Sequence, residues 1–97
     1  MAIGASTRML RASGVTGKLL AGGRQAATLG RWVLEPVDGG HRVTAAPVSV
    51  DRFWLTHGGR FTLLLGMGAR VWRWNGARVI DYSEREIVIQ AEGRPEE

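Results

Sequence analysis

Two glycine-containing stretches invite comparison with phosphate-binding loops, and neither meets the requirements of one. Gly17-Lys18 lacks the glycine five positions before Gly17, where Ala12 stands, and Leu19 occupies the place of the magnesium-binding serine or threonine. Gly66-Met67-Gly68 lacks the third glycine of a dinucleotide-binding loop and precedes a strand-like run rather than a helix. The sequence therefore predicts no nucleotide site.

The two histidines, His41 and His57, both stand beside glycines in predicted turns. A metal site needs three or four ligands, and Asp38 near His41 is too little, so we predict two solvated turn histidines and no metal. Ser49 and Asp51 precede His57 in the chain, but nothing in their spacing requires a nucleophile, a base and an orienting acid to meet.

Glu84 and Glu86 have the period of two that places side chains on one face of a strand, and paired carboxylates can perform acid–base catalysis. We expect them instead to hold a turn with Arg85. The chain contains no cysteine, which excludes a disulfide framework, a zinc ribbon and a thiol nucleophile. We therefore predict a protein that is not an enzyme and that needs no cofactor.

The most informative cluster, Trp72-Arg73-Trp74, stands directly before Asn75-Gly76. An Asn-Gly pair between two alternating runs is the strongest short-range signal for a β-hairpin, because both turn positions need a positive φ. We therefore predict a hairpin over residues 69–82, in which Trp74 faces Ala77. Trp72 and Trp74 share one face and are expected to pack into the core.

On the other face of this hairpin, Arg73 is predicted to lie directly opposite Arg78. Like charges in such a pair are unfavourable, and an acidic surface or a phosphate would relieve them. We therefore predict that Arg73 and Arg78 form a contact patch, with Trp72 and Trp74 as further anchors.

The elements around this hairpin are short apolar runs that end at glycines. One strand is expected from Trp32 to Val37, before the turn Asp38-Gly39-Gly40, and Pro47 marks an edge or a bulge because it cannot donate to a ladder. Further strands are expected over residues 42–46, 48–55, 60–65 and 86–91. Six or seven closely spaced strands predict a mainly β fold, either a small antiparallel β-barrel or a sandwich.

The net charge of +4 is unevenly distributed, because residues 1–34 contain no acidic residue. Their basic residues are Arg8, Arg11, Lys18, Arg24 and Arg31. Repeated glycines oppose a long helix in this region. We predict an extended or short-helical N-terminal arm over residues 1–30, a β-domain over residues 31–93 and a polar tail over residues 94–97. Removal of the arm is expected to leave a folded monomer.

The arm is expected to dock on an acidic surface or a phosphate backbone through Arg8, Arg11, Lys18 and Arg24. A disordered leader or an organelle transit peptide would have a similar composition, so these alternatives stay open. No window approaches about 18 consecutive apolar residues, so no membrane span is expected.

Residues Gly68, Val71, Gly76 and Val79, followed by an apolar strand at residues 87–89, form a pattern that resembles small β-barrel proteins of tailed bacteriophages. The resemblance covers residues 66–93 and concerns the head–tail joining and tail-attachment families. It implies a virion structural protein without catalytic residues, in the head–tail connector or neck, the tail or the capsid. The basic arm has no counterpart in that pattern.

Together these observations predict a non-enzymatic subunit that packs as a homo-oligomer among other structural subunits of a phage or phage-like particle. The expected location is the virion, after assembly in the host cytoplasm, and the basic arm leaves contact with nucleic acid open. The alternatives are a nucleic-acid-binding β-barrel and a subunit of a cellular ribonucleoprotein complex.

Overall fold

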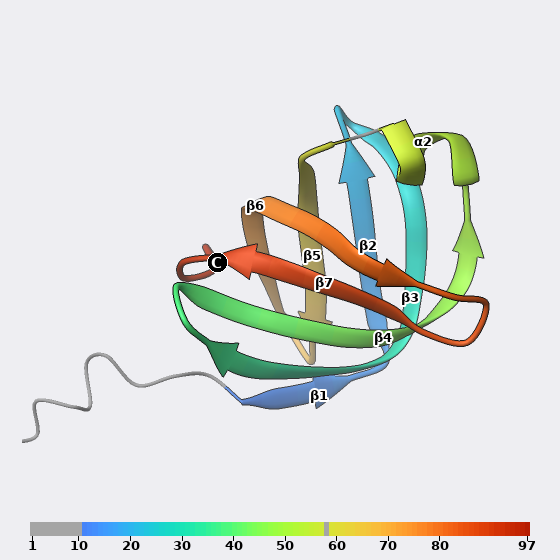
Figure 1. Ribbon diagram of the computed structural model, residues 1–97. Helices are drawn as coiled ribbons and strands as arrows, with labels where there is room; N and C mark the ends of the chain where they lie inside the picture. Colours follow the sequence, from blue (N-terminus) through green and yellow to red (C-terminus); the bar gives the residue numbers. More distant parts are fainter. Residues whose placement is uncertain (1–10, 58) are drawn as a thin grey trace, which may run out of the picture.

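The computed structural model describes residues 11–57 and 59–97, whose strands wrap into a barrel (Figure 1). The elements are β1 (Ala12–Gly14), β2 (Thr16–Ala21), β3 (Arg24–Val37), β4 (Gly40–Val50), α2 (Arg52–His57), β5 (Phe61–Met67), β6 (Arg70–Tyr82) and β7 (Ile87–Glu92). Among the described residues, no helix is long and apolar enough to cross a membrane.

The barrel consists of two antiparallel three-stranded units, β2–β3–β4 and β5–β6–β7, which α2 connects. β2 pairs with β5 and β4 pairs with β7, and these two pairings close six strands into a ring. β1 is an additional strand that pairs with the second half of β3. The predicted mainly β fold is therefore confirmed, and the choice between barrel and sandwich falls on the barrel.

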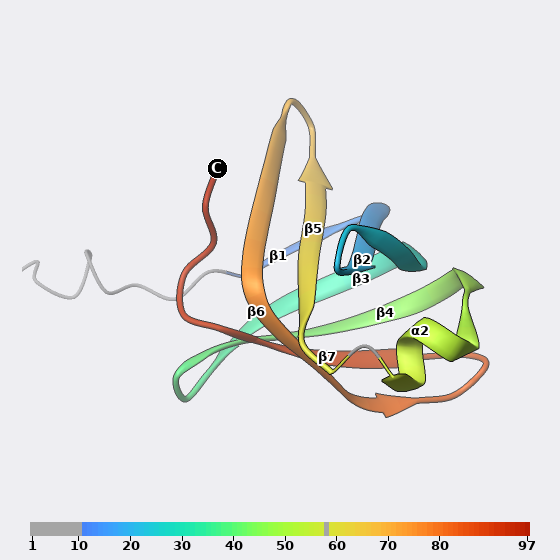
Figure 2. The same cartoon turned by 90° about the horizontal axis from the view of Figure 1, so that it is seen from above.

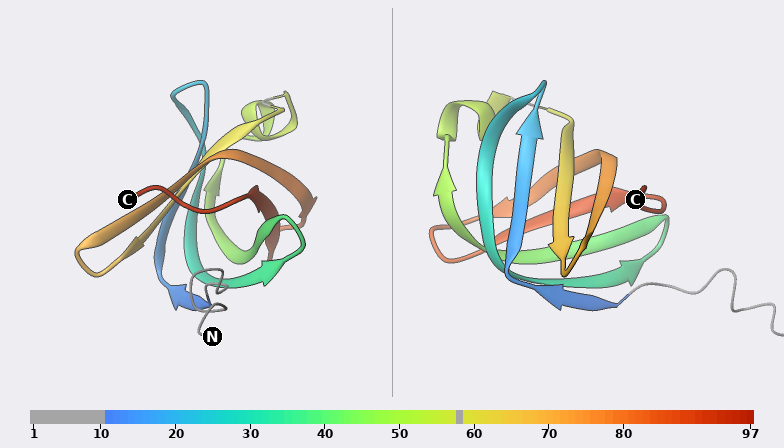
Figure 3. Two further views of the ribbon diagram at one scale, coloured as in Figure 1. Left: turned by 90° about the vertical axis from the view of Figure 1, so that its left-hand side faces the viewer. Right: turned by 180° about the vertical axis from the view of Figure 1, so that it is seen from behind.

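One hairpin extends past the closed ring. The β5–β6 hairpin projects away from the barrel wall, and the C-terminal residues run beside its β6 strand (Figures 2 and 3). Its two-residue turn is Gly68-Ala69, where Gly68 has a φ of 62°, a conformation that a side chain would disfavour.

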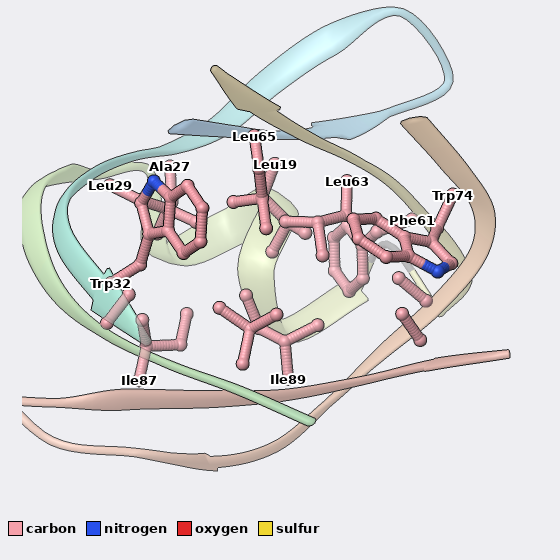
Figure 4. Close-up of a cluster of buried hydrophobic side chains, with 14 of the residues drawn as sticks. Leu19, Ala27, Leu29, Trp32, Phe61, Leu63, Leu65, Trp74, Ile87 and Ile89 are labelled. Carbon is pink, nitrogen blue, oxygen red and sulfur yellow. The ribbon is translucent and has the colours of Figure 1, made fainter. Parts of the chain in front are cut away.

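Alternation along each strand fills the barrel interior. In β5, for example, the predicted inward face of Phe61, Leu63 and Leu65 is buried, as a half-exposed strand with a period of two requires. Figure 4 shows Trp32 and Trp74 toward opposite ends of this core, with aliphatic side chains between them. Both indole N–H groups are satisfied, since Trp32 donates to the carbonyl of Thr16 at 2.8 Å and Trp74 to that of Gly93 at 3.3 Å.

The predicted arm over residues 1–30 is wrong for residues 12–30, which form β1, β2 and the first half of β3. Gly17, Leu19 and Ala21 alternate as buried positions along β2, so of the two expected forms, extended or short-helical, this segment takes the extended one. Repeated glycines oppose a helix, but a strand tolerates them when side chains of the neighbouring strands fill the space beside them. Residues 1–30 therefore include one complete barrel strand and part of a second, while residues 1–10 lie outside the described residues.

The predicted hairpin at Asn75-Gly76 is also wrong, because β6 runs without a turn from Arg70 to Tyr82. Trp74 pairs with Leu63 of β5 rather than with Ala77. Gly76 does not have a positive φ, and the register shift between β5 and β6 places Asn75-Gly76 at a bulge. Pairing with two different strands, β5 and then β7, outweighs the local turn preference.

Two smaller expectations concern β4 and the residues after it. Pairing between β4 and β7 stops at Ala45, so Pro47 lies where only β3 is paired, next to a register shift, as predicted. The strand expected to continue through residues 52–55 is instead the short helix α2. Asp51 begins it by accepting a hydrogen bond from the backbone N–H of Trp54 at 3.3 Å.

Close packing at Gly14 gives the first testable prediction. A Cβ atom at Gly14 would lie 2.5 Å from a ring carbon of Trp32, whereas one at Gly66 would meet its nearest atoms at 3.6 Å. Gly14→Ala should therefore lower the free energy of unfolding by about 1–3 kcal/mol through overpacking. Gly66→Ala, the matched control, should leave it unchanged or raise it by up to about 1 kcal/mol.

Urea unfolding followed by tryptophan fluorescence measures both values. Equal stability of the two variants would contradict the packing of Trp32 against β1.

Candidate functional site

The residues considered for catalysis do not come together. His41 is 5% exposed and belongs to β4, so the prediction of a solvated turn histidine is wrong for His41, while His57 is exposed at the end of α2. Among residues 11–57 and 59–97, no group of three His, Cys, Asp or Glu side chains is placed to hold a metal. Ser83 holds the turn before β7, since its hydroxyl accepts hydrogen bonds from the backbone N–H groups of Arg85 and Glu86.

Trp72 and Trp74 point into the barrel, as predicted, and their rings meet edge to face with centroids 6.4 Å apart. Both rings are buried, so they do not serve as exposed anchors. Arg73 between them points outward, also as predicted. The indole N–H of Trp72 donates to a carboxylate oxygen of Glu97 at 3.3 Å, which connects the core to the end of the chain.

Arg73 and Arg78 lie five positions apart on one strand and not opposite each other, because the predicted hairpin does not form. Arg73 pairs with Leu64 of β5, and Arg78 pairs with Gln90 of β7. The unfavourable pair of like charges therefore does not exist. Arg73 instead forms an ion pair of 2.9 Å with Glu96.

Glu96 belongs to the C-terminal segment, which we define as residues Gly93–Glu97. Gly93 is its anchor: its N–H donates to the carbonyl of Gly39 at 2.9 Å, and its own carbonyl accepts from Trp74 at 3.3 Å. Nδ1 of His41 lies 3.0 Å from the same carbonyl, and since a carbonyl only accepts, Nδ1 carries the proton. Gly93 has a φ of 71°, which turns the chain toward β6.

The first half of β6 has an open side in the described structure. β5 pairs with β6 from Arg70 onward, whereas pairing with β7 begins only at Ala77. We call residues Arg70–Asn75 of this side the open edge of β6. The C-terminal segment covers it at one point, where Arg73 and Glu96 exchange two main-chain hydrogen bonds of 2.8 and 2.7 Å.

Side chains of the open edge also contact the two glutamates. Arg70 lies 3.7 Å from Glu97, and the amide of Asn75 donates to Glu96 at 3.4 Å. The ion pairs of the arginines are more than half exposed to solvent. Exposed ion pairs contribute about 0–1 kcal/mol each, so these two pairs add little to the hold on the C-terminal segment.

An apolar groove lies beside the open edge. It has a volume of about 430 Å³, and its walls are Ser13–Thr16 on one side and Gly66–Gly68 with Arg70 and Val71 on the other. Val15, Met67 and Val71 line it with side chains that are 73%, 37% and 53% exposed. Val71 is shared with a second hollow of about 220 Å³, which Leu64, Arg73, Glu96 and Glu97 complete.

The basic residues predicted for the arm are distributed over the barrel rather than along a tail. Lys18 is exposed on β2, beside Leu64 of β5, and Arg11 is exposed before β1. Arg24 lies at the start of β3, and its guanidinium stands 5.3 Å from the ring centroid of Trp54. Arg8 lies outside the described residues.

An exposed aromatic cluster on α2 escaped the sequence reasoning, which assigned its residues to a strand. Phe53 is 60% exposed, and its ring centroid lies 5.2 Å from that of Trp54 and 4.8 Å from that of His57. The sequence signal that could have found it is the run Phe53-Trp54-Leu55, whose apolar side chains are too many for one inward strand face. With Arg24, the cluster combines a cation and the exposed side chain of Phe53.

The role of Arg73 gives the second prediction. Arg73→Glu places like charges beside Glu96, so the C-terminal segment should detach from β6. Arg78→Glu makes the same charge change on the same strand away from that segment and should leave it in place. Heteronuclear NOE values at Glu96 and Glu97 should fall in the first variant alone, and both variants should lose about 1 kcal/mol of stability or less. An unchanged NOE in Arg73→Glu would contradict the ion pair.

Comparison of the chain with protein-family models, with curated proteins and with solved structures finds no match.

Proposed function

We propose that the chain is a non-enzymatic structural subunit of a tailed-phage or phage-like particle, which docks against neighbouring subunits through the outer surface of its barrel. The observation that carries the proposal is the apolar groove, where Val15, Met67 and Val71 are exposed around one hollow. Exposed apolar side chains that cluster around a hollow are typical of interaction sites, whereas isolated ones are not.

The groove exists because Gly66 has no side chain. In the cross-strand register Thr16, Gly66 and Val71 occupy one row, so the missing side chain leaves a depression between β2 and β6. A partner side chain that enters this depression would remove apolar surface from water, which stabilises a complex by about 25 cal/mol per Å². A small barrel gains much from such contacts, because a short chain buries only part of its own surface.

The interior of the barrel supports a structural rather than an enzymatic role. Its inward side chains are mainly packed apolar residues, including Trp32, Leu63 and Ile89, and the buried His41 is held by the carbonyl of Gly93. On the outer surface, the ionisable side chains of the ion pairs Arg60–Glu92, Arg70–Glu97 and Arg73–Glu96 are more than half exposed, so they do not line an enclosed site.

The phage assignment rests on the resemblance at residues 66–93, and the structure changes how its pattern is interpreted. Gly68 makes the β5–β6 turn, Val71 lines the groove, and Val79 lies further along the same strand. The pattern therefore describes one projecting hairpin tip and the strand that continues from it. In a ring of identical subunits, such a tip would enter a neighbour, and head-to-tail contacts of this kind close when the rotation permits.

Filling the groove tests the docking role. Gly66→Val should fit the strand, because a Cβ at this position makes only ordinary contacts. It should abolish self-association while leaving the thermal unfolding midpoint unchanged or higher. Thr62→Val, on the same outer side of β5 but away from the groove, should associate as the wild type does.

Light scattering over a range of protein concentrations measures the masses. We expect the mass of the wild type and of Thr62→Val to rise with protein concentration. The mass of Gly66→Val should stay at the value of a monomer. A wild-type protein that remains monomeric throughout, or a Gly66→Val protein that still associates, would contradict docking through the groove.

A second candidate function is binding of single-stranded nucleic acid, and the cluster on α2 favours it. Exposed Phe53 offers a stacking surface, Arg24 lies over the ring of the neighbouring Trp54, and Arg52 precedes Phe53 in the chain. Proteins that bind single strands without sequence preference combine such aromatic platforms with cationic side chains.

The nucleic-acid candidate predicts binding to an oligothymidine that weakens steeply as salt rises, because counterions are released. Phe53→Ala should weaken it by about 1–3 kcal/mol, the contribution of one stacked base. Val71→Ala, which removes an exposed apolar side chain elsewhere, should not change it. Fluorescence anisotropy measures all three proteins, and absence of binding at low salt would exclude this candidate.

A further inference from the structure

We propose that the open edge of β6 is a strand-docking site for an acidic, extended segment of a neighbouring subunit, and that the C-terminal segment occupies this site in the free protein. The inference rests on the proposed docking role and adds the chemistry of the partner. It is carried by the contacts between Arg70–Asn75 and Gly93–Glu97.

The main chain of the open edge is the first part of the argument. Arg73 exchanges both its hydrogen bonds with Glu96, so its N–H and C=O point away from β5. Alternate residues of a strand direct these groups to the same side, so Val71 presents its N–H and C=O at the same edge. A longer strand than the C-terminal segment would therefore find further donors and acceptors along β6.

The charges at the edge select the chemistry of the occupant. Arg70 and Arg73 both contact carboxylates of the C-terminal segment, at 3.7 and 2.9 Å. Trp72 and Asn75 add N–H donors directed at the same two glutamates, at 3.3 and 3.4 Å. The side chains of Arg70, Trp72, Arg73 and Asn75 thus supply hydrogen-bond donors along β6. A segment that carries carboxylates matches these donors.

The C-terminal segment is suited to be displaced. Its firm attachment is at Gly93, which Gly39, His41 and Trp74 hold. Beyond this anchor, its contacts with β6 include the bridge at Glu96, a part-buried hydrogen bond from the indole of Trp72 to Glu97, and ion pairs of Arg70 and Arg73 that are largely exposed to solvent. A partner strand that makes the same contacts and continues past Val71 would replace it, with Val71 and Leu64 beneath the partner in the adjoining hollow.

The test uses the full chain and the peptide acetyl-Thr-Glu-Val-Glu-Thr-Glu-amide, with matched peptides that carry Gln or Lys in place of Glu. Glu96→Pro removes the donor and the carboxylate that close the edge, so this variant should bind the acidic peptide about tenfold more tightly than the wild type. Chemical shifts in ¹⁵N-resolved spectra should change at the main chain of Val71 and Arg73 and at the indole of Trp72.

Charge reversal provides the matched control. In the Glu96→Pro background, Arg73→Glu should weaken binding of the acidic peptide at least about fivefold and create binding of the Lys peptide. Arg78→Glu in the same background, on the half of β6 that β7 covers, should bind as the parent does. The Gln peptide should bind more weakly than the Glu peptide.

Three results would overturn the inference: no binding at millimolar peptide, shift changes away from the open edge, or equal losses in the two arginine variants. A failed titration is distinguishable from failure of the docking role itself, because the effect of Gly66→Val on association is measured without any peptide. Association through the groove with no peptide binding would leave the docking role in place and remove the strand site.

Discussion

Closure of the sheet by the β2–β5 and β4–β7 pairings is the constraint on which the rest of the structure depends. A ring of six strands gives every strand one inward and one outward face, so apolar residues at alternate positions produce one continuous core. Closure also determines the length of β6, whose first half completes the hairpin with β5 and whose second half supports β7. The open edge of β6 is a consequence of this division. The first half of the strand projects beyond the ring with β5 on one side and no pairing with β7 on the other.

The division between inward and outward faces decides where function can reside. In the Trp72-Arg73-Trp74 run, both tryptophans are buried in the core and only Arg73 lies on the surface. The outer face is uneven because its side chains differ in size. Gly66, which has no side chain, lies directly beside the exposed side chain of Val71. In a barrel with a filled interior, the proposed docking therefore has to use the uneven outer surface of the wall rather than an internal cavity.

Local patterns predicted what short-range physics controls. Three features could be predicted because each depends on residues a few positions apart. They are the alternation of Phe61, Leu63 and Leu65, the turn after Val37 and the edge position of Pro47. The Asn75-Gly76 hairpin failed because two distant strands pair with β6 on either side of that point. For the same reason the contact of Arg73 with Glu96 could not be predicted, since it exists only after β7 brings the end of the chain back to β6.

The weak hold of the C-terminal segment is consistent with two demands on the same edge. An uncovered strand edge is a template for unwanted pairing, and a short charged segment laid across it blocks such pairing in the free protein. A segment that covered the edge with a complete ladder would also block a proper partner. One bridge at Glu96, exposed ion pairs and an anchor at Gly93 lie between these extremes. Under the proposed docking, this arrangement protects the edge from uncharged strands and leaves it accessible to an acidic one.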